Sequence, residues 1–175
     1  MQRVTLATIY SHPVAKKYVV RAGLDHAIKT ALTAFDIALR ENVDTDLATK
    51  AAFLHDIGHY QWYRDGEWDF YSYKENDIHA IKGAERAHKL LIRLGEGRKA
   101  AKEIALAILL HTDSYLPEGQ LQLDPLQQVV ARADEANEEA AGVHHYREIP
   151  EDTAIVQLQS LDQHVAATEV QRKTS

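Results

Sequence analysis

Apolar residues recur along the chain at the three- and four-residue spacing of amphipathic α-helices. One such stripe consists of Ala27, Ala31, Ala34 and Ala38. Alternation between apolar and polar positions never extends beyond a few residues, so the pattern does not favour β-strands. We therefore predict an all-α fold, a compact bundle of about six helices. The approximate bounds of these helices are 13–40, 44–58, 76–95, 98–111, 124–141 and 152–170.

Local signals support several of these boundaries. Asp124 is a typical N-cap residue, and Pro125 follows it at the first helical position. Gly58 is predicted to end the second helix as a C′ glycine. Residues 60–75 are expected to form a loop, and a second loop is expected around Pro117.

Length and composition fit a single domain over residues 1–175. Apolar residues make up 45% of the chain, which is enough for a sizeable core. No apolar run approaches the length of a transmembrane helix, and the first residues lack the apolar region of a signal peptide. Cysteine is absent, which excludes disulfides and thiolate metal ligands and agrees with a reducing cytoplasm. We therefore expect a cytoplasmic protein that does not span a membrane.

The net charge of −6 does not favour binding to duplex nucleic acid. An anionic substrate could still bind where a metal ion supplies local positive charge. The chain has ten histidines and no cysteine, so any metal site must use imidazole and carboxylate ligands. Such ligands suit Fe, Mn, Co, Ni or Zn.

Four polar residues lie on the apolar faces of separate predicted helices: His26, His55, His111 and Asp134. A carboxylate turned into a core costs several kcal/mol unless it is paired or bound to a metal. Residues of this kind can offset their costs together by surrounding one cation, as helix bundles often do. Each residue alone could equally be a hydrogen-bonded core histidine or an ion-pair partner. Their combination favours a metal site.

The order His26, His55-Asp56 and Asp134 resembles the H…HD…D signature of the HD superfamily of metal-dependent phosphohydrolases. The segment AAFLHDIGH resembles the family's apolar run into its HD dipeptide, and VVARADEAN resembles the family's terminal helix with the last aspartate. This resemblance spans about residues 20–140, leaving the helix at 152–170 as a C-terminal addition. It implies an HD-type helical bundle in which these four residues bind a divalent metal.

Two further histidines resemble the second-metal ligands of the dinuclear HD branches. His79 stands in HAIKGAE and His111 in ILLHT. The resemblance implies that they hold a second ion, although His79 could instead be an exposed residue at a helix start. Gly83 lies one turn after His79, where the lack of a Cβ would let another helix approach closely.

Known branches differ at the position of His59. Mononuclear branches often have an acid there, and the diadenosine-tetraphosphate hydrolases usually have lysine. The phosphonate-cleaving di-iron oxygenases have histidine at this position, but they have lysine where this chain has Tyr115. The residues therefore leave the branch open.

The resemblance implies hydrolysis of a phosphoester or phosphoanhydride, in a nucleotide or another small phosphorylated metabolite, by a metal-activated hydroxide. Asp56 would bridge two ions, or orient the water at one ion. His59 could donate a proton to the leaving group or bind a phosphate oxygen, or it could be a supporting histidine. Lys82 could reach a phosphate, or it could be a solvated surface residue.

Seven of the thirteen aromatic residues lie between residues 60 and 73. They could form a lid that stacks on a flat substrate group, or they could pack on the protein's own surface or in a homo-oligomer interface. His144 and His145 are expected in a loop after the last ligand helix. His12, His88 and His164 lie in polar surroundings.

Two alternative functions remain open at this stage. The same ligand set would serve a di-iron oxygenase of the HD type. It would also serve a ligand-sensing or scaffold domain in which the metal is structural.

Overall fold

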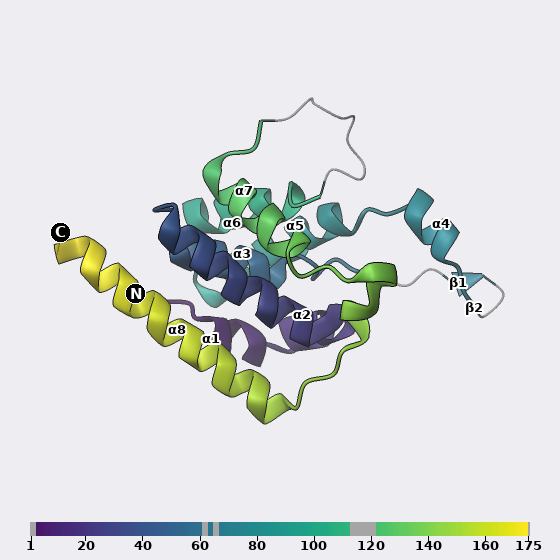
Figure 1. Cartoon of the computed structure of the whole chain (residues 1–175), viewed down its shortest axis with the longest axis horizontal. Helices are drawn as coiled ribbons and strands as arrows, with labels where there is room; N and C mark the ends of the chain where they lie inside the picture. Colours follow the sequence, from purple (N-terminus) through teal and green to yellow (C-terminus); the bar gives the residue numbers. More distant parts are fainter. Residues whose placement is uncertain (1–2, 61–62, 65–66, 113–121, 175) are drawn as a thin grey trace.

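The computed structural model describes residues 3–60, 63–64, 67–112 and 122–174 (Figure 1). Within these ranges the chain forms eight α-helices, one 3₁₀-helix and a pair of two-residue antiparallel strands. In chain order these are α1 (Leu6–Ser11), α2 (Pro13–Arg40), α3 (Thr45–Leu54), β1 (Tyr63–Arg64), β2 (Glu67–Trp68), α4 (Phe70–Glu75), α5 (His79–Leu94), α6 (Arg98–Leu109), α7 (Pro125–Glu135), η1 (Ala140–Tyr146) and α8 (Glu151–Thr174).

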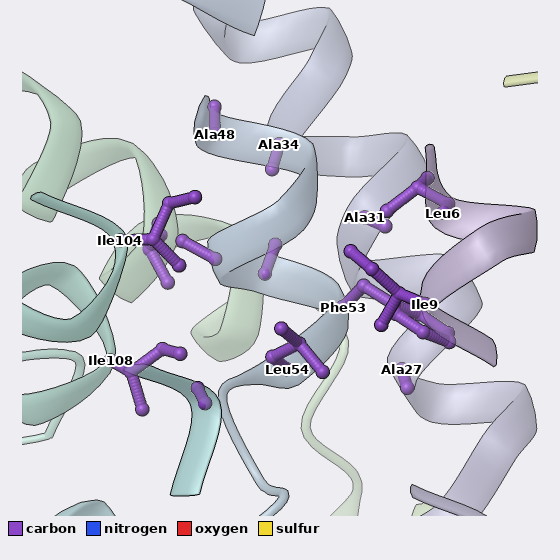
Figure 2. Close-up of a cluster of buried hydrophobic side chains, with 14 of the residues drawn as sticks. Leu6, Ile9, Ala27, Ala31, Ala34, Ala48, Phe53, Leu54, Ile104 and Ile108 are labelled. Atoms are coloured by element: carbon purple, nitrogen blue, oxygen red, sulfur yellow. The ribbon is translucent and has the colours of Figure 1, made fainter. Parts of the chain in front are cut away.

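Helix α3 lies at the centre of the bundle. Eight of its ten residues are buried, and it contacts α1, α2, α6, α7 and α8. Figure 2 shows its Phe53 and Leu54 between alanines of α2 and the isoleucines of α6. Alanines on both α2 and α3 let these helices pack closely, because the side chains at the contact set the distance between helix axes. The central position of α3 places the residues at its C-terminal end deep inside the protein.

The long predicted helices are present, and local signals account for their ends. Helix α2 has the predicted bounds, and α7 begins with a complete capping box between Asp124 and Gln127. Helix α5 ends at Gly95, whose φ of 92° is the left-handed conformation of a C-terminal glycine. Helix α7 is shorter than predicted: it ends at Glu135, and η1 begins at Ala140, near the predicted end of the helix.

Gly58 does not end the second helix as a C′ glycine, so this prediction was wrong. Helix α3 ends at Leu54, and Gly58 is not among the described residues with positive φ. A Cβ at Gly58 would lie 2.0 Å from the carbonyl oxygen of His79 and 2.3 Å from the nitrogen of Gly83. This glycine therefore permits close contact between the turn after α3 and the start of α5. The predicted role of Gly83 is confirmed, since a Cβ there would lie 3.2 Å from the carbonyl oxygen of His55.

The segment 60–75 was expected to be a loop, but it contains β1, β2 and α4. Figure 1 shows these three elements extending away from the bundle. They are too short to produce a recognisable period in the sequence, and α1 was missed for the same reason. At the opposite side, α8 packs against α1 and α2. None of the described helices is both long enough and apolar enough to cross a membrane.

Substitution of Gly58 tests the contact between the turn and α5. We expect Gly58→Ala to destabilise the protein by about 1–3 kcal/mol or more, because the new Cβ would meet backbone atoms that cannot move independently. Gly97→Ala is the control, because nothing lies within 4 Å of the added Cβ, and it should change stability by about 0.5 kcal/mol or less. Urea unfolding in the presence of a chelator measures the free energy of unfolding of both variants. Equal stability of the two variants would contradict the close contact.

Candidate metal centre

Six predicted ligands come together from five different helices and the turns that follow them. His26 lies in α2 and Asp134 in α7. The C-terminal ends of α3 and α6 supply His55, Asp56 and His111, and His79 is the first residue of α5. All six are buried, with exposed fractions of 9% or less.

The first half of the cluster joins His26, His55 and Asp134. The Nε2 atoms of the two histidines are 3.2 Å apart. Asp134 Oδ1 lies 3.0 Å from His26 Nε2 and 3.1 Å from His55 Nε2. Asp56 Oδ2 lies 3.3 Å from His55 Nε2. Four potential ligand atoms from three parts of the chain, α2, the turn after α3 and α7, thus lie close together.

The second half joins His79 and His111, whose Nε2 atoms are 3.1 Å apart. Asp56 Oδ1 lies 3.5 Å from His79 Nε2 and 3.9 Å from His111 Nε2. The two oxygens of the Asp56 carboxylate therefore face the two halves, one each. This is the arrangement of a carboxylate that can bridge two cations.

Hydrogen bonds at Nδ1 fix the protonation of three rings. His55 Nδ1 lies 2.6 Å from the carbonyl oxygen of Ala52, and His111 Nδ1 lies 2.6 Å from that of Ile108. His79 Nδ1 lies 2.7 Å from the Asp77 carboxylate. Each Nδ1–H must donate to its acceptor, so each neutral ring has a lone pair at Nε2. Backbone and carboxylate groups therefore orient the Nε2 lone pairs toward the centre of the cluster.

The spacing of these lone pairs fits a shared cation. Two lone pairs about 3 Å apart repel each other unless a proton or a metal ion lies between them. Metal–imidazole bonds of about 2.0–2.1 Å place two nitrogens of one ion roughly 2.9–3.4 Å apart. The distances between Nε2 atoms, 3.1 Å for His79 and His111 and 3.2 Å for His26 and His55, lie within this range. The donors present are therefore compatible with divalent metal ions in both their chemistry and their spacing.

His55 and the two carboxylates of the cluster stabilise one another's charged forms. Burial alone would lower the pKa of His55, but the Asp56 and Asp134 carboxylates raise it well above the ordinary value. Burial would raise the pKa values of both carboxyl groups, but His55 holds them well below their usual range. His111 differs, because burial and the nearby His55 lower its pKa to about 4. A metal ion that replaced the proton of His55 would therefore release it to solvent.

Four residues of the cluster, Asp56, His79, His111 and Asp134, line a cavity of about 180 Å³. Two of its wall residues, His144 and His145, were expected in a loop after the last ligand helix, but they belong to η1. No nearby motif indicated their place, since they follow the segment that carries the recognisable signature. The cavity is lined by Asp56, His59, His79, His111, Thr112, Asp134, Glu138, His144 and His145.

His59 also lines the cavity. Its ring stacks on His79 with centroids 5.3 Å apart and lies 4.6 Å from the ring of His145. Burial, partly opposed by Asp56, lowers the pKa of His59 to about 4. Lys82, in contrast, is not among the residues that line the cavity, and its ammonium group lies 4.2 Å from the centre of the Tyr60 ring.

The aromatic segment is only partly described. The Tyr60 hydroxyl donates to the carbonyl oxygen of Asn76 at 2.5 Å and accepts from the Ile78 amide at 3.2 Å, so this ring packs on the protein's own surface. Tyr71 is 81% exposed. Trp62, Tyr115 and the loop expected around Pro117 lie outside the described residues.

Comparison with known proteins places this geometry in a family. The model of the HD domain family matches residues 23–137, which contain all six clustered residues. The chain belongs to the HD-domain family. A relative in Bacillus subtilis (strain 168), named "Putative phosphohydrolase YueE", is 61% identical over 93% of this chain and 93% of its own length.

A solved structure also resembles this HD-domain protein. It is the crystal structure of a predicted HD superfamily hydrolase from an uncultured Thermotogales bacterium, with a TM-score of 0.52 and 22% identity. The similarity covers 94% of this chain and 91% of that one, and it shows that the fold is shared. The predictions of an all-α HD fold and of a hydrolase of this superfamily are confirmed.

The pKa of His59 gives a testable pH dependence. The folded state holds the pKa at about 4, whereas an unfolded histidine has a pKa near 6.5. The unfolded chain therefore binds the proton first, and His59 costs the wild type stability as pH falls from about 6.5 to about 4. We expect His59→Gln to lack this loss, which amounts to about 1.4 kcal/mol per pH unit at most. Urea unfolding of both metal-free proteins across this range measures it, and parallel pH curves would contradict a neutral, buried His59.

Proposed function

We propose that this HD-domain protein is a phosphohydrolase that uses two divalent transition-metal ions to cleave a phosphoester or phosphoanhydride of a small metabolite. The observation that carries the proposal is the Asp56 carboxylate, whose two oxygens face two separate groups of imidazole nitrogens. A single-ion site would have no need of the second pair, His79 and His111.

The ligands divide between two ions in this proposal. One ion would be held by His26, His55 and Asp134. The other would be held by His79 and His111, and Asp56 would bind both ions. A mixed imidazole and carboxylate set without thiolate favours Fe, Mn, Co, Ni or Zn over Mg or Ca. Such ions, when bound, lower the pKa of water and neutralise the charge that develops on a phosphoryl group.

The remaining polar residues of the cavity would position the substrate. His59 lies beside His79 on the cavity wall, where it can bind a phosphoryl oxygen or pass a proton to the leaving group. A bound phosphate would favour its protonated form, because an anion nearby raises the pKa of a histidine. Catalysis of phosphoryl transfer depends mainly on such positioning and charge stabilisation.

The cavity size supports a small substrate group. Pockets that enclose a whole drug-sized ligand measure about 300–1,000 Å³. The cavity here, about 180 Å³, suits a phosphoryl group with part of its leaving group. The name of the Bacillus subtilis relative agrees with phosphohydrolysis. A nucleotide substrate and a cytoplasmic location remain predictions from the sequence.

The ligand variants test the proposal directly. We expect His55→Ala and Asp56→Ala to lose both bound metal and hydrolysis of p-nitrophenyl phosphate, because each removes a ligand of the cluster. His79→Ala should lower the metal content from about two ions to one, as expected for a dinuclear site. Elemental analysis of manganese-loaded protein and a phosphoester panel measure both. His164→Ala, on the exposed face of α8, is the control.

Several outcomes would contradict parts of this proposal. Unchanged metal content in both His55→Ala and Asp56→Ala would overturn the ligand assignment. Bound mixed-valent iron with oxygen uptake would favour the oxygenase alternative. A metal-loaded wild type that hydrolyses none of a broad phosphoester panel would favour a sensing or scaffold role.

Asp77 offers a more selective test of the second ion. Its carboxylate accepts the Nδ1–H of His79 and also the amide of that residue. Loss of such a partner typically weakens metal binding about 10–100-fold. We expect Asp77→Ala to lower the affinity for the second manganese ion by this factor, while the affinity for the first ion stays unchanged. Calorimetric titration with manganese measures both affinities. Asp152→Ala, in the exposed first turn of α8, should bind both ions as the wild type does.

A further inference from the structure

The η1 segment contributes two adjacent histidines to the cavity that have no part in the ligand set. Their ring centres are 4.1 Å apart. His144 is 7% exposed, and its ring lies 4.4 Å from that of His26. Both follow the segment that matches the HD family model, which ends at residue 137. They therefore lie outside the segment that carries the family signature.

A backbone hydrogen bond fixes the protonation of His144. Its Nδ1 accepts the amide hydrogen of Glu139 at 2.9 Å, so Nδ1 must carry the lone pair. The proton of the neutral ring is then on Nε2. His144 lines the cavity, and with its proton on Nε2 the ring offers a hydrogen-bond donor at this atom and not a lone pair for a metal. It could bind a metal only by giving up either this proton or the bond to Glu139.

His145 attaches the same segment to α2. Its Nδ1–H donates to the carbonyl oxygen of Ala22 at 2.7 Å. Gly23 interrupts α2 at this point with a φ of 123°, a conformation that favours glycine. A Cβ at Gly23 would lie 3.1 Å from the Cα of His145. The kink in α2 thus provides both the acceptor for His145 and the space for η1.

The charge of the cavity indicates what the donor binds. The carboxylates of Asp56, Asp134 and Glu138 line the same space, so an anion can enter only after cations have offset them. With metal bound, His144 on the cavity wall would offer its N–H to an oxygen of the bound anion. A charged oxygen is the acceptor that gains most from such a bond.

We propose that His144 is a substrate-binding residue whose Nε2–H donates to a phosphoryl oxygen, and that His145 positions it by holding η1 against α2. This inference rests on the proposed phosphohydrolase function. It predicts that the affinity for phosphate, but not the affinity for metal, depends on a donor at the position of Nε2.

Two amide variants of His144 separate the roles of its nitrogens. The asparagine oxygen can replace Nδ1 as acceptor for the Glu139 amide, but asparagine has no donor at the Nε2 position. The glutamine amide reaches the Nε2 position and can donate there. The probe is inorganic phosphate, titrated calorimetrically into the full-length, manganese-loaded protein. His164→Asn, on α8, is the matched control.

We expect His144→Asn to bind phosphate about tenfold more weakly or worse, the loss typical for a hydrogen bond to a charged group. Its manganese content and that of His144→Gln should equal the wild type, and His144→Gln should keep most of the phosphate affinity. Equal phosphate affinity in His144→Asn and the wild type would overturn the proposal. If His144→Asn does not fold, a folded His144→Gln that binds phosphate more than tenfold worse would overturn it instead.

Measurements on the wild type distinguish failure of this inference from failure of the proposed function. A manganese-loaded wild type that neither binds phosphate nor hydrolyses a phosphoester would overturn both. A wild type that does both, beside a His144→Asn variant of equal phosphate affinity, would overturn only the role of His144.

Discussion

The burial of two carboxylates, Asp56 and Asp134, is the constraint on which the rest of the structure depends. A buried carboxylate costs several kcal/mol unless opposite charge and hydrogen bonds compensate it. Here the compensation comes from imidazoles on separate helices, so those helices must converge on one point. Both His55 and His111 stand just beyond a helix end, where each Nδ1–H reaches a carbonyl three residues earlier. The same local device thus aims two rings from α3 and α6 at the carboxylates.

The turn that carries His55 and Asp56 is held rigidly from outside. Gly58 and Gly83 let the turn lie directly against α5. The Arg86 guanidinium, one turn further along α5, donates to the carbonyl oxygen of Ile57 and lies 3.6 Å from the centre of the Tyr18 ring. These contacts fix the ligand positions without using a ligand atom. A site built this way can hold its geometry before any ion arrives, which favours tight binding.

Local signals explain which parts of the fold were predictable. The long helices were predicted because caps such as Asp124 and the apolar period lie within a few neighbouring residues. The inward-facing polar residues indicated a metal site, and the family resemblance supplied its six members. Lys50 shows the limit of this reasoning: it is 1% exposed in the core, paired with Asp46 and with the distant Glu96. An ion pair across 46 residues leaves no local pattern.

His144 and His145 were unpredictable for the same reason. Their partners in α2 and in the ligand cluster lie more than a hundred residues earlier, and η1 is too short for a period. The signature residues lie within 23–137, whereas this wall of the cavity follows that segment. The metal ligands can therefore stay constant while the wall changes. Such a division would let one metal centre serve proteins that differ in substrate.

The negative cavity also links metal and substrate binding. Without cations, Asp56, Asp134 and Glu138 oppose the entry of a phosphate, so its affinity must rise when the ions bind. Thermodynamic linkage makes this coupling reciprocal, and a bound phosphate must strengthen ion binding by the same factor. In the proposed site, the second ion would be held by only His79, His111 and the shared Asp56, so it would have the fewest protein ligands and its affinity would rise the most. In the proposed function, the substrate would thus help to complete the site that cleaves it.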